Sequence, residues 1–387
     1  MLGFANVLLA EEWAGFHLSA PLPDPERLVR NHFSIRQSFV LPDGGLEYQV
    51  VYDRTSKRQF VDLASELSQS GYRPELTGTT DEAVLTLRKV DGTPERLSRL
   101  PVLLALFTFV TLVVFALLQQ LVYEQLIPTL PGYFVFFEIG ATIAVLLGAH
   151  ELGQRLAARS RGGGHASSYL IPGIPFLPPF LPSMGFVASQ RRPALNRDRL
   201  FDTVIAGPLA ILALALLAYA IGDLTAVQSS VVYQGSHLAN TTVSVNSNAI
   251  QMGVDSILGP FLPQVATGYV LVSPIADGAT VGFIIVFLGL LPMVSYDGGI
   301  LSAIAWGTRT SRVLSYLSVF ALLVLDTPTY WAIAVVVLLL AGRPFQLKLM
   351  DDVSELSQWR QWAFVGSLVL AFLCLPVPHN IGTLPLP

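Results

Sequence analysis

Apolar residues are unevenly distributed along this chain, and their spacing divides it into two unlike parts. From Leu100 onward, long apolar runs are separated by short polar segments. Before that point, charged residues recur every few positions and the apolar runs are short. A helix needs about 20 mainly apolar residues to cross about 30 Å of hydrocarbon. The pattern therefore predicts a soluble domain over 1–98 and a membrane domain over 99–387.

The second part is expected to be an all-α, polytopic membrane core with about six to seven transmembrane helices. The expected helices lie near 101–123, 133–158, 201–221, 279–297, 311–325, 328–342 and 361–377. The segment 170–188 is rich in proline and apolar residues. We expect it to re-enter the membrane or to lie on its surface, because non-helical backbone at membrane depth must be buried in protein or line a wet cavity.

The first part is expected to be a small α+β domain. Gly44-Gly45 separates two runs of β-forming residues, which predicts a hairpin. Apolar residues then recur at helical spacing until Gly71, where the helix is expected to end. We expect strands at 38–41, 48–51 and 83–87 and a helix at 60–67.

Composition supports the membrane assignment and excludes some functions. Charged residues make up 13% of the chain and hydrophobic residues 52%, whereas about a quarter of a soluble protein is charged. The net charge is −4 and no basic patch is present, so we expect no nucleic-acid partner. The single cysteine, Cys374, excludes a disulfide framework or a cysteine-based metal site within one chain.

The positions of the basic residues predict the orientation in the membrane. No Lys or Arg occurs between Arg199 and Arg309, so the polar loop 222–278 is expected outside the cell. Seven arginines lie between Arg155 and Arg199, at the end of the second expected helix and in the loop that follows it, which is expected inside. The chain is thus predicted to be a multi-pass protein of the cell membrane, with a cytoplasmic N-terminal domain and an external C-terminus.

Ionisable residues inside apolar helices are costly and therefore indicate function. His150 and Glu151 lie near the end of the second expected helix, and Asp297 lies at the end of the fourth. The predicted orientation puts both ends at a similar depth on the cytoplasmic side. If these two helices pack together, the three side chains converge.

His150-Glu151-Leu152-Gly153-Gln154 begins like the metalloprotease motif His-Glu-x-x-His. In that motif two imidazoles share one helix face, and the Glu beside them acts as general base on a metal-bound water. Here Gln154 replaces the second histidine. Taken alone, the dipeptide is better explained by the end of a helix at the membrane interface.

Four motifs in order extend the comparison beyond that dipeptide. They are His150-Glu151, then Asn196-Arg197-Asp198 with Phe201-Asp202, then Ala206-Gly207-Pro208, and finally Pro292 with Asp297-Gly298-Gly299. This order resembles the site-2 protease family of intramembrane zinc metalloproteases, from about residue 36 to the C-terminus. With its N-terminal extension, the chain is most similar to the archaeal and chloroplast branch.

The resemblance implies a role for each matching position. It implies that His150 and Asp297 bind zinc and that Glu151 activates water. The third ligand falls on Gln154, and the position of an asparagine that helps to hold substrate or the oxyanion falls on Gly289. Because a neutral amide is a poor zinc ligand, we expect zinc to be bound weakly or not at all. His165, in the adjacent loop, is the remaining candidate for a replacement ligand, although the sequence favours a solvated loop histidine there.

Three functions remain open at this point. The first is a pseudoprotease with a degenerate site, which binds or regulates transmembrane helices of other proteins in the bilayer, alone or in a larger membrane assembly. The second is an active intramembrane zinc metalloprotease that cleaves such helices. The third is a channel, transporter or membrane-complex subunit in which His150, Glu151 and Asp297 move ions. The sequence favours the first.

Overall fold

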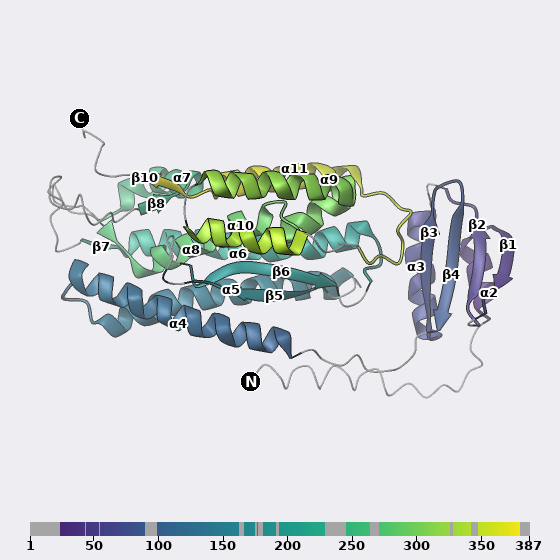
Figure 1. The fold of residues 1–387 in the computed structure, drawn as a ribbon, viewed down its shortest axis with the longest axis horizontal. Helices are drawn as coiled ribbons and strands as arrows, with labels where there is room; N and C mark the ends of the chain where they lie inside the picture. The colour runs from purple at the N-terminus through teal and green to yellow at the C-terminus, as the bar shows by residue number, and fades with distance from the viewer. Residues whose placement is uncertain are drawn as a thin grey trace. The chain divides into compact units, whose positions relative to one another are not determined.

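The computed structural model (Figure 1) shows a chain that forms two compact units. One unit comprises 1–94 together with 350–354, and the other comprises 95–349 together with 355–387. The residues described below are 24–42, 44–53, 55–89, 99–161, 166–174, 176, 181–190, 193–228, 245–263, 271–325, 328–341 and 347–379.

The N-terminal unit is a four-stranded antiparallel sheet in the order β1-β2-β4-β3, with two helices. Its elements are α2 (Pro25–His32), β1 (Ile35–Val40), β2 (Leu46–Val50), α3 (Ser56–Gln69), β3 (Tyr72–Gly78) and β4 (Ala83–Lys89). Gly44 and Gly71 both have positive φ, as a hairpin turn and a helix end require. The predicted hairpin, helix and last strand are therefore present, whereas α2 and β3 were not predicted.

A distant segment of the chain completes this sheet. The amide of Leu76 in β3 donates to the carbonyl of Met350 over 2.6 Å, and the amide of Asp352 donates to the carbonyl of Leu76 over 3.0 Å. Tyr52 and Ser354 share a hydrogen bond of 3.0 Å between their hydroxyl groups. Residues 350–354 thus cover the β3 edge, which would otherwise be open to pairing with another chain.

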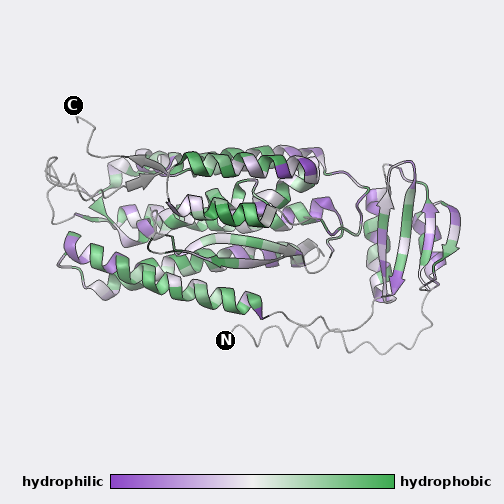
Figure 2. Cartoon of the chain, in the orientation of Figure 1, coloured by the Kyte–Doolittle hydropathy of each residue, from purple (hydrophilic) through white to green (hydrophobic). Residues whose placement is uncertain are grey.

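The second unit is mainly helical, and its helices carry long apolar surfaces (Figures 1 and 2). Its main helices are α4 (Leu100–Leu126), α5 (Gly132–Arg161), α6 (Arg197–Leu224), α8 (Pro274–Leu290), α9 (Asp297–Val324), α10 (Pro328–Ala341) and α11 (Gln358–Leu373). Among the described residues, α4, α5 and α6 are long and apolar enough to cross a membrane by length and composition. The expectation of six to seven such spans is therefore not supported.

The fourth and fifth expected helices have different limits in the structure. The helix expected over 279–297 ends at Leu290, and Asp297 begins α9 instead. Helix α9 starts well before the expected residue 311, and it bends at Gly307, whose φ of 85° interrupts the helix. The reason is local: Pro292 and the turn that follows stop α8, and the chain then re-enters a helix at once.

The prediction of an all-α core is wrong for the segment between α5 and α6. Strands β5 (Ala166–Pro172) and β6 (Ser183–Gln190) form an antiparallel pair that packs against α4 and α8. The expected re-entrant or interfacial loop 170–188 therefore contains β-structure at both ends. Residues 175 and 177–180 of that loop lie outside the described residues, as does His165.

Smaller elements follow α6 in the region expected to be the external loop. They are β7 (Val227–Gln228), β8 (Val245–Ser247), α7 (Ala249–Leu258), the 3-10 turn η1 (Gly259–Phe261) and β9 (Leu271–Val272). Strand β8 pairs with β10 (Val377–His379), and β7 pairs with β9. Residues 229–244 and 264–270 lie outside the described residues.

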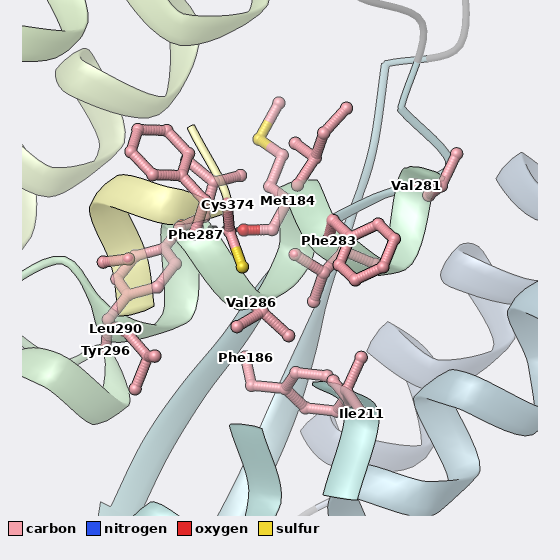
Figure 3. Close-up of a cluster of buried hydrophobic side chains, with 14 of the residues drawn as sticks. Met184, Phe186, Ile211, Val281, Phe283, Val286, Phe287, Leu290, Tyr296 and Cys374 are labelled. Atoms are coloured by element: carbon pink, nitrogen blue, oxygen red, sulfur yellow. Dashed lines mark hydrogen bonds between the residues drawn. The ribbon is translucent and has the colours of Figure 1, made fainter. Parts of the chain in front are cut away.

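Helix α8 lies at the centre of the apolar core (Figure 3). Most of its length is buried, including Val281, Phe283, Val286, Phe287 and Leu290. These side chains meet others from β6, α6 and the end of α11, which are Met184, Phe186, Ile211 and Cys374 (Figure 3). Every residue of α8 from Val281 to Leu290 is buried, which accounts for the absence of polar side chains in that part of the helix.

Candidate functional site

The structure brings His150 and Asp297 into direct contact. Nε2 of His150 in α5 lies 2.7 Å from Oδ2 of Asp297, and both side chains are about 1% exposed. When the Asp297 carboxylate is ionised it only accepts hydrogen bonds, and Nε2 of the imidazole is then the donor. Nδ1 of His150 is buried and has no partner among the described residues.

Gln154 completes the arrangement one helical turn beyond His150. Its amide nitrogen donates to Oδ1 of Asp297 over 3.1 Å, and its amide oxygen accepts from the hydroxyl of Ser168 in β5 over 2.7 Å. The orientation of the amide follows from chemistry, since only the NH₂ end is able to bond the carboxylate. The four residues thus form one buried hydrogen-bonded chain that joins α5, β5 and α9.

A close turn places Asp297 at this point. The turn between α8 and α9 contains Ser295, which has a positive φ of 70°, and the amide of Ala188 in β6 donates to its carbonyl over 2.8 Å. A Cβ at Gly298 would lie 2.3 Å from the carbonyl oxygens of Leu290 and Leu291. Glycine is therefore required there, because the start of α9 passes directly against the end of α8.

The ring of His150 is fixed between two neighbours. It stacks on Phe186 of β6, with ring centroids 3.6 Å apart and planes 11° apart. On α6, a Cβ at Gly207 would lie 2.6 Å from Cδ2 and Nε2 of the imidazole. The glycine of Ala206-Gly207-Pro208 therefore makes room for the ring. Sequence reasoning noted this motif but missed its contact with His150, and it missed Phe186 and Ser168 altogether.

Glu151, the residue expected to activate water, has a different partner. Its carboxylate accepts from Nε of Arg155, one turn along α5, over 2.9 Å. The side chain of Glu151 is 26% exposed, in contrast to its buried neighbour His150. Adjacent positions on a helix point about 100° apart, so the two side chains leave α5 in different directions.

The described residues do not fit a catalytic zinc ion. Such an ion takes three protein ligands, and tetrahedral geometry at bonds of about 2.0–2.1 Å separates two ligand atoms by about 3.3 Å. His150 and Asp297 supply two such ligands, and a hydrogen bond holds their atoms closer together, at 2.7 Å. Gln154 directs its only ligating atom, the oxygen, to Ser168 instead. No group of three His, Cys, Asp or Glu side chains that could hold a metal occurs in the described part of the chain.

Gly289 lies in a buried stretch of α8, and the space beside it is open. A Cβ built at this position meets no atom within 4 Å, although Gly289 and the residues beside it in α8 are buried. The packing therefore leaves a gap where the resemblance implies an asparagine side chain. A single added methyl group therefore fits here without displacing its neighbours.

The motif Asn196-Arg197-Asp198 with Phe201-Asp202 has a structural role. Asn196 caps α6 by accepting from the amide of Arg199 over 3.0 Å. Arg360 of α11 binds Asp198 over 2.9 Å and Asp202 over 2.8 and 2.7 Å. These polar residues therefore hold the starts of α6 and α11 together, and none of these bonds reaches His150 or Asp297.

Comparison with known proteins gives a limited but consistent result. The chain is 27% identical over 254 residues to "Probable zinc metalloprotease EGY2, chloroplastic" of Arabidopsis thaliana. It is 25% identical over 249 residues to the protein of the same name from Oryza sativa subsp. indica. Each match covers 61% of this chain but only 41% or 42% of the relative, so the chain matches about two fifths of their length. No family model and no solved structure matches.

Proposed function

We propose that this chain is a site-2-protease-like membrane protein whose zinc centre has been replaced by hydrogen bonds, so that it acts as a pseudoprotease. The observation that carries the proposal is the buried chain of Ser168, Gln154, Asp297 and His150. Its members hydrogen-bond one another without an ion and leave Nδ1 of His150 without a partner among the described residues. The similarity to chloroplast proteins named probable zinc metalloproteases supports descent from a working zinc centre.

The proposed role is to bind transmembrane helices of other membrane proteins without cleaving them. Cleavage of a peptide bond would need an activated water and a stabilised oxyanion. In this chain the carboxylate of Glu151 is paired with Arg155, and position 289 carries no side chain that could donate a hydrogen bond.

The proposed orientation puts the N-terminal domain and the His150 site on the cytoplasmic side, and the C-terminus outside. Two contacts agree with it. Arg360 joins the starts of α6 and α11, so these starts belong on one side of the membrane. Strand β10, after α11, pairs with β8, after α6, so the two helix ends belong together on the other side.

Metal analysis and a cleavage assay on the full-length protein test this function. We expect well under one zinc per chain and no cleavage of a model transmembrane substrate, with or without added zinc. Glu151→Gln is the control, because it removes the proposed base and leaves the buried network intact. Stoichiometric zinc, together with cleavage that Glu151→Gln abolishes, would instead establish the second candidate, an active metalloprotease. The name of the relatives favours this candidate.

A further inference from the structure

Helix α7 and the η1 turn present an unusual surface at one end of the helical unit (Figure 1). Three large apolar side chains point outward: Met252 is 51% exposed, and Ile257 and Phe261 are each 73% exposed. The polar residue Gln251 is buried instead, at 3% exposure. A helix that bordered water would show the opposite arrangement.

Hydrogen bonds fix this rotation of α7, so it is built into the fold. Gln251 donates from Nε2 to the hydroxyl of Thr280 in α8 over 2.7 Å, and its Oε1 accepts from the backbone amide of Asn248 over 3.0 Å. One turn further, Asp255 accepts from the hydroxyl of Tyr219 in α6 over 3.0 Å. With both polar side chains held inward, Met252, Ile257 and Phe261 lie on the outer side, while Ile250 and Val254 pack against the core.

The same bonds fix the depth of α7 relative to the membrane. On α6, Asp202 and Asp223 bracket an uncharged stretch, and their spacing of 21 positions corresponds to about 32 Å. That length matches the hydrocarbon thickness of about 30 Å. Tyr219 lies one turn inside Asp223 and holds Asp255, so α7 lies at the boundary between acyl chains and headgroups. Tyrosine is enriched at this level in membrane proteins.

We propose that α7 and η1 form an interfacial helix whose apolar face, made of Met252, Ile257 and Phe261, contacts the acyl chains of the outer leaflet. On α6, Ile221 and Leu224 beyond Tyr219 are also exposed, at 45% and 46%. No Lys or Arg occurs between Arg199 and Arg309, so the contact depends on acyl chains and not on anionic headgroups. The inference needs the bundle to cross a membrane, and its choice of leaflet rests on the proposed orientation, but it is independent of the zinc question.

Fluorescence quenching in phosphatidylcholine vesicles tests this contact. The full-length protein, with the buried Cys374 replaced by serine, carries Ile257→Cys labelled with an environment-sensitive dye. We expect strong quenching by doxyl-labelled lipids and several-fold weaker quenching by aqueous iodide. The matched control is Val40→Cys, because Val40 is 75% exposed in the N-terminal unit. Its label should be quenched by iodide and not by the lipids.

Each other result would reject the proposal. If iodide quenches the label at Ile257 as fully as the label at Val40, the helix borders water. If neither quencher reaches Ile257, another protein surface covers the helix, either a second copy or a partner. Quenching should also be unchanged when anionic lipid or salt is added, and a strong dependence on either would contradict the acyl-chain contact. Met252→Cys repeats the measurement at a second position on the same face.

Discussion

Gln154 donates a hydrogen bond to Oδ1 of Asp297 over 3.1 Å, at the position where the resemblance implies a third zinc ligand. A histidine there would present a lone pair to a metal, whereas the amide presents a proton to the carboxylate. Glutamine in place of histidine at position 154 changes what holds α5 and α9 together. In a zinc centre the ion binds the buried aspartate, and here hydrogen bonds with His150 and Gln154 hold it instead.

The first prediction restores the missing ligand. Gln154→His should raise zinc affinity about tenfold or more, because it provides the third ligand beside His150 and Asp297. Metal analysis of the purified variant measures the change. Gln154→Met is the control, since it has a similar length but adds no imidazole, and it should gain no zinc. If Gln154→His also gains none, the surroundings no longer permit a zinc centre, and the proposed descent from one loses its support.

The second prediction concerns the stability of the buried network. Removing the donor by Gln154→Leu should lower the free energy of unfolding by about 1–3 kcal/mol, because Oδ1 of Asp297 is left buried without that bond. Thermal unfolding in detergent measures the difference. Glu151→Gln is the comparison: its side chain is partly exposed and paired only with Arg155, so its effect should stay within about 0.5 kcal/mol. Equal effects of the two substitutions would show that the hydrogen bond from Gln154 stabilises the fold no more than the partly exposed pair of Glu151 and Arg155 does.

The third prediction compares two glycines in buried helices. Gly207→Ala should destabilise the protein by about 1–3 kcal/mol, because the new methyl group would lie 2.6 Å from the His150 ring, which is stacked on Phe186. Gly289→Ala should be neutral or stabilise by up to about 1 kcal/mol, since it enters open space and favours the helix. The same unfolding measurement decides. The reverse order would mean that the space at Gly289 is closed in solution.

Much of the architecture could be predicted from periodicity, and the exceptions have physical reasons. Long apolar runs identify α4, α5 and α6 because crossing a bilayer demands length and low charge. The strands β5 and β6 were not predicted because a run rich in proline and glycine indicates a loop. Tertiary contacts decide their pairing with each other and with the α8–α9 turn. The pairing between Leu76 and Met350 could not be predicted from the sequence either, since it joins distant parts of the chain.

The site was partly predictable for the same reason. His150 and Asp297 stand out because ionisable residues in apolar surroundings are rare, and the structure places them 2.7 Å apart. Ser168 and Phe186 carry no such signal, since serine and phenylalanine are common in any membrane domain. Glu151 shows the limit of a motif: the sequence places it next to His150, but its partner is set by the helix surface on which it lies.

The fourth prediction concerns pH and the N-terminal unit. Burial raises the pKa of the Asp351 carboxyl above its ordinary value, although its Oδ1 accepts from the amides of Val353 and Ser354. The folded state then binds the proton more tightly than the unfolded state does. The contribution of the Asp351 carboxyl to the stability of the fold is therefore greatest at low pH and is lost as pH rises through its folded-state pKa. Asp351→Asn should remove this loss.

The amide of Leu76 donates a hydrogen bond to the carbonyl of Met350. The rate of hydrogen exchange at this amide measures the effect. Relative to the parent protein, Asp351→Asn should be more protected at about pH 8 than at about pH 4. Asp53→Asn should show the opposite trend, because hydrogen bonds from Thr55 and Ser56 lower the pKa of Asp53, so its contribution is lost as pH falls. If the two variants change with pH in the same direction, the buried carboxylate of Asp351 is not the cause.

The fifth prediction tests the orientation in the membrane. Val227→Cys, at an exposed position after α6, should react with a membrane-impermeant thiol reagent added outside intact cells. Ser160→Cys, at an exposed position near the end of α5, should react only after the membrane is opened. The reason is the charge distribution: arginines gather around the end of α5, and no Lys or Arg occurs between Arg199 and Arg309.

A third position separates this orientation from the depth of α7. Ile257→Cys lies on the same side as Val227 in the proposed orientation, but its label should sit among acyl chains. It should therefore react more slowly than Val227→Cys with the impermeant reagent, while both remain accessible from outside. Exclusive labelling of Ser160→Cys in intact cells would invert the orientation, because it would place the arginine-rich end of α5 outside. The N-terminal domain would then be external too, since α4 and α5 together return the chain to the side on which α4 begins.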